Sequence, residues 1–156
     1  MPETSLLTDD VRALIGIEHP LEPARVTLRS VRRSMEVYFG APQPADYAEG
    51  DPVPGYAIAG LDSDGDSGRP EPPRLLPNSL LISNDWHFER PLRLGEAFSR
   101  VYVVTNISER FGGRFGYSID VRSETRFIDA AGEVAARSGS TLTQYDAAAA
   151  RASEEA

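Results

Sequence analysis

Residues 117–127 read YSIDVRSETRF, and this stretch decides the fold class. Apolar or small side chains at the odd positions alternate with polar or charged side chains at the even positions. A period of two held over this length predicts a long β-strand with one buried and one solvated face. Any fold for the chain must therefore give this strand neighbours.

The flanking segments supply those neighbours. Further strands are predicted at residues 98–107, rich in valine and aromatic residues, at 133–145, and, shorter, at 86–90. The glycine pair Gly112-Gly113 and the segment Asp129–Gly132 provide the turns between the three longer strands. The C-terminal half is predicted to be a meander of antiparallel strands.

One amphipathic helix precedes the strands. Leu28, Val31 and Met35 recur at helical spacing, with arginines on the opposite face, and Gly40 and Pro42 end the pattern. We expect a helix of about three turns over residues 28–39. A helix packed on an antiparallel sheet is an α+β architecture.

Composition excludes several chemistries. The chain has 156 residues and no cysteine, and all 16 basic residues are arginine, because lysine is absent. Thiol nucleophiles, disulfides, thiolate metal sites, Schiff-base lysines and phosphate-loop lysines are therefore excluded. Carboxylate and imidazole chemistry stays open.

The net charge of -8 argues against nucleic acid as a partner. We see neither a signal peptide nor an apolar run long enough to span a membrane, so a cytoplasmic location and no membrane partner are expected.

The chain is predicted to form one domain over residues 1–146. A proline- and glycine-rich loop interrupts it at about 42–77. Residues 147–156, mostly alanine and charged residues, are expected to be a flexible tail, either a frayed helical turn or disordered.

The segment Ser83–Glu96 reads SNDWHFERPLRLGE and resembles the signature of the MaoC-like dehydratase N-terminal domain family, approximately Gly-Asn-Glu-x-Glu-Phe-x-Arg-Pro-x-Arg-x-Gly-Asp. The resemblance extends over roughly residues 11–145, with further matches at Leu14–Gly16, Pro72-Pro73, Glu109-Arg110, Gly116 and Asp129–Glu133.

This resemblance implies a hot-dog fold, in which a curved antiparallel sheet wraps a long central helix. It also implies association with a second hot-dog domain, either a heteromeric catalytic subunit or a second copy. Members hydrate 2-enoyl-CoA or dehydrate 3-hydroxyacyl thioesters, a lyase activity of fatty-acid or polyketide metabolism, at a site between two hot-dog units. The ligand expected here is an acyl-CoA or acyl-carrier-protein thioester, with no cofactor and no metal.

The catalytic residues of that family are not preserved. Catalytic hot-dog hydratases carry Gly-Asp-x-Asn-Pro-x-His after the helix, whereas residues 40–46 here read GAPQPAD. Gln43 takes the asparagine position, Ala41 replaces the acid and Asp46 replaces the histidine. Alanine cannot transfer a proton, so the usual acid–base pair is absent.

Three interpretations remain open. The chain is the non-catalytic half of a two-part hydratase, or a stand-alone dehydratase or thioesterase with an altered site, or a binding and assembly module without turnover. An altered site would use Asp46 with Gln43, or His87. Whether the chain is itself an enzyme is therefore not decided by the sequence.

The signature segment supplies the other site candidates. His87 is either part of a polar cluster near the ligand or an edge-strand histidine, and Asn84 and Asp85 are candidate walls of the site. Arg90 and Arg93 are candidates for binding a CoA phosphate, or else solubilise an edge strand.

Two further motifs are not expected to be binding sites. The acidic run Asp62–Gly68 lacks the glycine and glutamate that a calcium-binding EF-hand loop requires, so it is expected to be a solvated loop. The segment Arg110–Gly116 has the composition of an RNA-binding segment but stands where a hairpin turn is expected.

Overall fold

The computed structural model describes residues 5–41, 46–55 and 69–154. The elements follow one another as α1 (Asp9–Arg12), β1 (Glu18–Arg25), α2 (Leu28–Phe39), β2 (Pro52–Val53), β3 (Asn78–Phe88), β4 (Leu92–Arg93), β5 (Ala97–Arg110), β6 (Ser118–Ile128), β7 (Val134–Tyr145) and α3 (Ala147–Glu154). Gln43 and the acidic run 62–68 lie outside the described residues.

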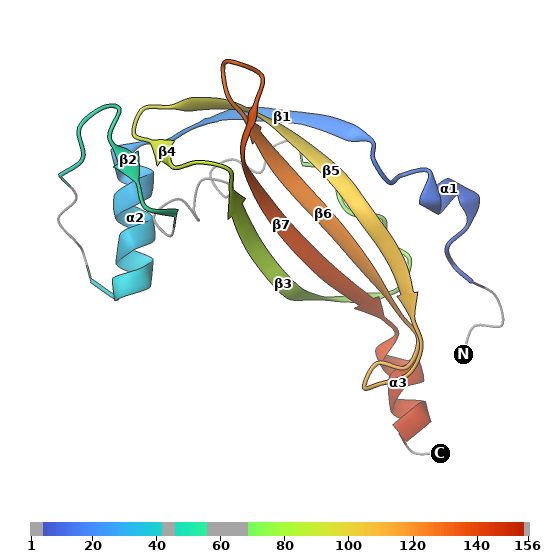
Figure 1. Cartoon of the computed structure of the whole chain (residues 1–156). Coiled ribbons are helices and arrows are strands. Elements are labelled where there is room, and N and C mark those ends of the chain that lie inside the picture. The colour runs from blue at the N-terminus through green and yellow to red at the C-terminus, as the bar shows by residue number, and fades with distance from the viewer. Residues whose placement is uncertain (1–4, 42–45, 56–68, 155–156) are drawn as a thin grey trace.

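The main sheet has five strands in the order β1-β5-β6-β7-β3, and every neighbouring pair is antiparallel. Figure 1 shows that the long strands curve strongly along their length. β5, β6 and β7 form the predicted meander, with Val121 of β6 opposite Ile107 of β5 and Leu142 of β7. The α+β architecture and the long alternating strand are confirmed.

Helix α2 covers one end of this sheet (Figure 1). It begins at a capping box, in which Thr27 and Ser30 each accept a hydrogen bond from the other's backbone N–H, and ends at Gly40 with φ 70°. Val31 and Met35 pack against Phe98 and Phe127 of the sheet. The helix has the bounds predicted from its spacing, but it packs only near this end of the sheet.

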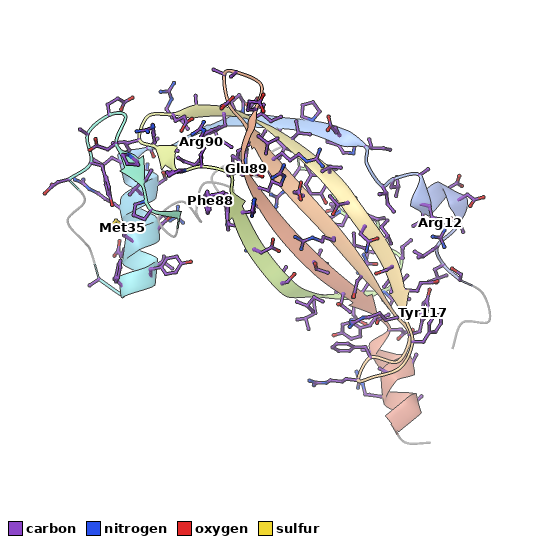
Figure 2. All side chains as sticks on the ribbon, viewed as in Figure 1. Arg12, Met35, Phe88, Glu89, Arg90 and Tyr117 are labelled. Carbon is purple, nitrogen blue, oxygen red and sulfur yellow. The ribbon has the colours of Figure 1, made fainter. Side chains whose placement is uncertain are left out.

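A second apolar cluster fills the opposite end. Tyr102, Ile107, Ile119 and Val121 project from β5 and β6, and Leu7 covers them. In Figure 2, Met35 and Phe88 lie at the α2 end, and Arg12 and Tyr117 lie at the far end. One face of the sheet is thus buried by two clusters at its two ends.

The other face of the sheet carries ion pairs between strands. Arg126 lies 3.1 Å from Glu18 of β1 and 2.9 Å from Glu124, and Glu124 lies 3.7 Å from Arg137 of β7. Glu124 and Arg126 are even positions of the alternating stretch in β6, and both are half-buried. The charged side chains of that stretch therefore form ion pairs with neighbouring strands and are also in part exposed to solvent.

Several elements were not expected from the sequence, among them the short elements α1, β2 and β4. β1 is an additional strand, and it contains Pro20 and Pro23, which an edge strand tolerates. β3 runs from Asn78 to Phe88, so it begins eight residues before the strand expected at 86–90 and ends two residues before it. The C-terminal tail, for which a frayed helical turn or disorder was expected, contains α3, where Ala147 N–H donates to Asn78 Oδ1.

No helix in the described part of the chain is long and apolar enough to cross a membrane.

Candidate functional site

The end of α2 is the place where the resemblance puts the reacting groups. Gly40 N–H donates to Glu36 O at 2.8 Å, and its left-handed conformation turns the chain away from the helix. Ala41 follows at once. Further on, Asp46 is exposed, and the next residue, Tyr47, packs against the α2 core. Within residues 40–46, Asp46 is the one residue with an ionisable side chain.

His87 lies on β3, near that strand's C-terminal end. Its side chain is 65% exposed, and Nε2 is 3.4 Å from Glu89 Oε1. Its neighbours Trp86 and Phe88 point the other way and pack against the core beneath α2. Because side chains alternate along a strand, His87 projects from the face of the sheet that α2 does not cover.

Among the described residues, the structure shows no contact between Asp46 and His87. Tyr47, next to Asp46, contacts the core on the helix side of the sheet, whereas His87 lies on the ion-pair face. An acid and a base must be a few ångströms apart to share one hydration reaction. The chain alone does not assemble such a pair from these two residues.

Glu89 joins His87 to β7. Arg137 donates a hydrogen bond to Glu89, and this bond, more than any other contact, lowers the pKa of Glu89. The contact with His87 has a smaller effect in the same direction. Glu89 is thus a carboxylate held in its ionised form, which makes it an anchor for Arg137 and a poor proton donor near neutral pH.

Arg90 is tied into the fold. Its guanidinium donates to Glu96, in the turn before β5, and to Asp129 Oδ2 at 3.0 Å, in the turn between β6 and β7. Hydrogen bonds to these two carboxylates raise the pKa of Arg90 and lower that of Asp129. The arginine of the signature therefore holds two turns together.

Arg93 has a similar position. Its Nη1 donates to Gly50 O at 2.9 Å, and its backbone N–H donates to Glu96 Oε2 at 3.0 Å. The side chain is exposed and keeps further donors for an external group.

Asn84 and Asp85 lie on opposite faces of β3, opposite Ser140 and Gly139 of β7. Asp85 accepts two hydrogen bonds from Arg122 of β6, each 3.0 Å long. These bonds raise the pKa of Arg122. Asn84 is exposed on the same face as Trp86. Of the two candidate walls, only Asn84 lies on the face of the sheet that α2 covers in part.

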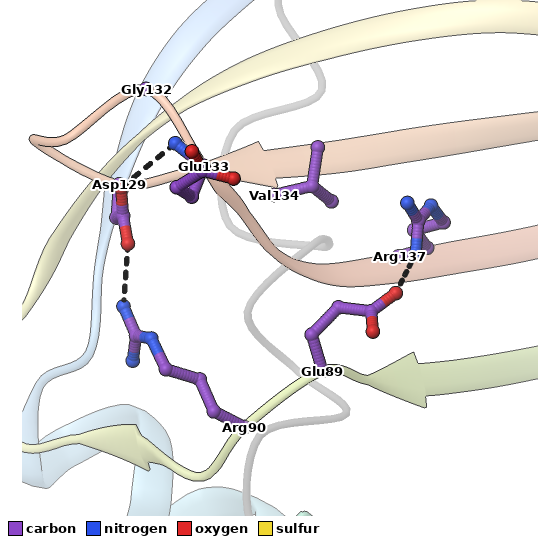
Figure 3. A pocket seen from close by; sticks show the side chains of 7 residues that line it. All are labelled: Glu89, Arg90, Asp129, Gly132, Glu133, Val134 and Arg137. Atoms are coloured by element: carbon purple, nitrogen blue, oxygen red, sulfur yellow. Dashed lines mark hydrogen bonds and ion pairs between the residues drawn. The ribbon is translucent and has the colours of Figure 1, made fainter.

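Two open clefts meet at Glu89 and Arg90. One has a volume of about 570 Å³ and is lined mainly by charged side chains (Figure 3). Figure 3 shows Arg90 directed at Asp129 and Arg137 directed at Glu89 across it. The other, of about 390 Å³, is bounded by Val53, Phe88 and Leu92. A polar cleft thus adjoins an apolar one.

Sequence reasoning did not find the partners in these clefts. Arg137, Glu96 and Asp129 were assigned only to strands and turns, although they hold Glu89 and Arg90 in place. These partners follow from the strand register, which neither the alternation in 117–127 nor the spacing of the signature residues reveals. Within residues 5–41, 46–55 and 69–154, no group of three or more carboxylates or histidines is arranged to hold a metal ion.

Comparison with protein-family profiles and with curated proteins finds no match. Solved structures are similar in fold. A chain of the ChsH1-ChsH2 complex from Mycobacterium tuberculosis superposes with a TM-score of 0.62 and 15% identity over 87% of both chains.

Two other structures agree with it. The MaoC-like dehydratase from Rhodospirillum rubrum has a TM-score of 0.56 and 18% identity, over 84% of this chain and 92% of that one. A chain of the HadBC (3R-hydroxyacyl-ACP dehydratase) complex from Mycobacterium tuberculosis has a TM-score of 0.53 and 14% identity, over 83% and 96%. The chain therefore has the hot-dog fold that MaoC-like dehydratases share, as the segment Ser83–Glu96 predicted.

Proposed function

We propose that this chain is the non-catalytic half of a MaoC-like hydratase or dehydratase that acts on acyl thioesters, and that a second hot-dog subunit supplies the acid and the base. The observation that carries the proposal is the end of α2, where Ala41 stands in place of the acid and Asp46 in place of the histidine. The lack of any contact between Asp46 and His87 in the described part of the chain is consistent with it.

An open sheet edge supports the need for a partner. Within the described part of the chain, β3 pairs with β7 along one edge and with no strand along the other. Leu80, Leu81 and Ile82 on β3 are 47%, 53% and 47% exposed. An edge strand with unpaired backbone groups and exposed apolar side chains is a template for a second sheet.

The comparison structures support the same arrangement. Two of them are complexes, ChsH1-ChsH2 and HadBC, and the second is described as a 3R-hydroxyacyl-ACP dehydratase. In the proposed pair, this chain contributes half of the site wall, with Asn84 and the cleft beside Phe88 as the surfaces that meet the acyl group. Arg93 remains our candidate for an anionic group of the ligand, because its side chain is exposed.

Reconstitution tests the proposal. The chain is purified alone, and then together with a hot-dog subunit of the same host that has the intact Asp and His, and hydration of 2-enoyl-CoA is followed by the loss of enoyl-thioester absorbance. We expect no turnover by the chain alone and robust turnover by the pair, above that of the catalytic subunit alone.

Each other outcome has a clear meaning. Turnover by the homogeneous chain would show a stand-alone enzyme and refute the proposal. A homodimer that binds an acyl thioester, forms no complex with the catalytic subunit and does not convert the ligand would instead support a binding module.

A further inference from the structure

The inner face of the sheet, which is the face that α2 covers in part, carries polar side chains between its two apolar clusters. The strand register sets them in two adjacent rows that run inward from the edge strand β3. Trp86, which stacks on Phe127 of the core, begins the first row. The six polar residues, here called the polar belt, are Ser138, Thr125 and Tyr102 in the first row and Asn84, Ser140 and Ser123 in the second.

The alternating stretch of β6 shows how the polar belt departs from an apolar face. Its odd positions face inward, and Ile119, Val121 and Phe127 are buried there. Ser123 and Thr125 occupy the odd positions between them and are buried as well. A hydroxyl on a buried face needs a hydrogen-bond partner to offset the hydration it has lost.

Part of the polar belt is satisfied within the chain. The hydroxyls of Ser123 and Ser140 form a hydrogen bond of 3.2 Å with each other. Thr125 Oγ1 accepts a hydrogen bond of 3.1 Å from Arg69 Nη2. These two bonds account for three of the six side chains.

The other three side chains have unused hydrogen-bonding groups. Tyr102 is 3% exposed, and its buried hydroxyl has no partner among the described residues. Within residues 5–41, 46–55 and 69–154, the side chains of Asn84 and Ser138 make no hydrogen bond either. Buried polar groups are nearly always paired, and an unpaired one lowers stability. The stability of the chain therefore does not explain why the belt is polar.

The polar belt can be reached from the apolar cleft. Phe88 bounds that cleft, and its ring stacks on Trp86 with 5.7 Å between the ring centroids and 8° between the planes. Next along the inner face of β3 comes Asn84, which is exposed, opposite the half-buried Ser140. An aromatic surface thus leads from the cleft to unused hydrogen-bonding groups.

We infer that the polar belt binds a hydroxyl or keto oxygen that the acyl group carries beyond its reacting carbons. The preferred ligands are then oxygenated acyl thioesters, and plain alkyl ones are disfavoured. An alkyl chain on this face would remove water from Asn84 and Ser138 and return no hydrogen bond, whereas an oxygenated chain replaces the lost water. This inference rests on the proposed function and adds the chemical class of the acyl group.

The fluorescence of Trp86 tests the inference directly, because Trp86 is the only tryptophan in the chain and begins the first row of the belt. Octanoyl-CoA is compared with a set of analogues in which one hydroxyl group is moved carbon by carbon toward the end of the chain. These saturated thioesters cannot be hydrated, so the titration measures binding alone. They are titrated into the full chain, alone and in the reconstituted pair, with Trp86→Phe to identify the signal of the partner subunit.

We expect at least one hydroxylated analogue to bind at least about tenfold more tightly than octanoyl-CoA, since a site that pairs with a hydroxyl discriminates against the ligand that lacks it. Asn84→Leu and Ser138→Ala should each bring the two affinities within about threefold of each other. Asn84 is exposed, so Asn84→Leu tests the inference even if Ser138→Ala fails to fold.

Ser83→Ala is the matched control. Ser83 adjoins Asn84 on β3 but lies opposite Thr141, which contacts Arg122 on the ion-pair face. This variant should keep the preference for the hydroxylated ligand. Equal affinity for all the ligands, tighter binding of octanoyl-CoA, or a preference that survives both Asn84→Leu and Ser138→Ala would each overturn the inference. No change in Trp86 fluorescence in either preparation would also overturn it.

The two proposals fail separately. Turnover of 2-enoyl-CoA by the reconstituted pair, together with no preference for a hydroxylated ligand, refutes only the role of the polar belt. A preference that depends on Asn84 and Ser138, together with a pair that converts neither plain nor hydroxylated 2-enoyl-CoA, refutes only the hydratase assignment.

Discussion

Arg122 of β6 and Asp85 of β3 are joined over the backbone of Gly139, which lies on β7 between them. Both nitrogen–oxygen distances are 3.0 Å. A Cβ atom at residue 139 would lie 2.5 Å from Arg122 Nη2 and 3.0 Å from Asp85 Oδ2. The ion pair therefore occupies the space that a side chain at residue 139 would fill, and the backbone of Gly139 is not in the left-handed region.

Gly139→Ala should lower the free energy of unfolding by no more than about 1 kcal/mol, because the methyl group displaces the ends of two flexible, partly exposed side chains and so costs only their ion pair. Urea denaturation at neutral pH measures this. In a double-mutant cycle, Gly139→Ala should cost less when Arg122 is already Ala, because the clash is then gone. Additive costs would show that the ion pair does not require this glycine.

Arg90→Leu should destabilise the protein by about 1–3 kcal/mol, because it leaves Glu96 and Asp129 without their shared donor. The measurement is the urea midpoint, with the KM of the reconstituted pair for 2-enoyl-CoA as the second readout. Lower stability with an unchanged KM assigns Arg90 to the two turns. Unchanged stability with a raised KM would instead support binding of a CoA phosphate.

Tyr117 should give the protein a stability that depends on pH at both extremes. Burial raises the pKa of Tyr117, and its hydrogen bond to Glu109 lowers the pKa of Glu109. The raised pKa of Tyr117 contributes stability at pH values below the ordinary tyrosine pKa near 10, and this stability is lost as pH rises through the raised pKa. The lowered pKa of Glu109 contributes stability at pH values above the ordinary glutamate pKa near 4, and this stability is lost as pH falls through the lowered pKa.

Tyr117→Phe should therefore flatten both limbs of a plot of urea midpoint against pH. Tyr38→Phe, at an exposed position, is the control and should keep the wild-type profile. If the two variants have the same profile, the contact between Tyr117 and Glu109 does not contribute to the pH dependence.

Ile82→Lys should weaken association with a second hot-dog subunit by at least about tenfold, since it places a charge on the open edge of β3. Ile17→Lys is a matched control, because Ile17 is 45% exposed and Ile82 is 47% exposed, and Ile17 lies outside every strand. Sedimentation velocity of the pair measures the change. A similar loss in both variants would place the interface elsewhere.

Asp46→Asn and His87→Gln, each in the reconstituted pair, should leave kcat within about threefold of wild type, whereas loss of an acid or base costs on the order of 100-fold or more. The same substitution of the partner subunit's catalytic Asp is the positive control. A collapse of kcat in either variant would assign a catalytic role to this chain.

Periodicity was sufficient to predict α2 and β6, because each buries one regular face, whereas β5 and β7 were predicted from their composition and from the turns beside them. β1 could not be predicted this way, since Pro20 and Pro23 interrupt its pattern and argue against a central strand. The start of β3 was hidden because Leu80, Leu81 and Ile82 are apolar in succession and do not alternate.

The candidate site was predictable only in part. The spacing of Arg90 and Glu96 places both near one turn, but the third partner, Asp129, comes from a distant hairpin and needs the strand register. The contact of His87 with Glu89, and of Glu89 with Arg137 of β7, likewise depends on strand pairing, which no local pattern encodes. A single chain also cannot display what a second subunit adds.

The two edges of the sheet are unequal, and this limits the size of any assembly. Pro20 and Pro23 remove backbone donors from β1, whereas β3 has no proline. With one edge closed to strand addition, a chain that pairs through β3 offers no second edge for growth. In the proposed complex, strand pairing through β3 should therefore stop at two sheets.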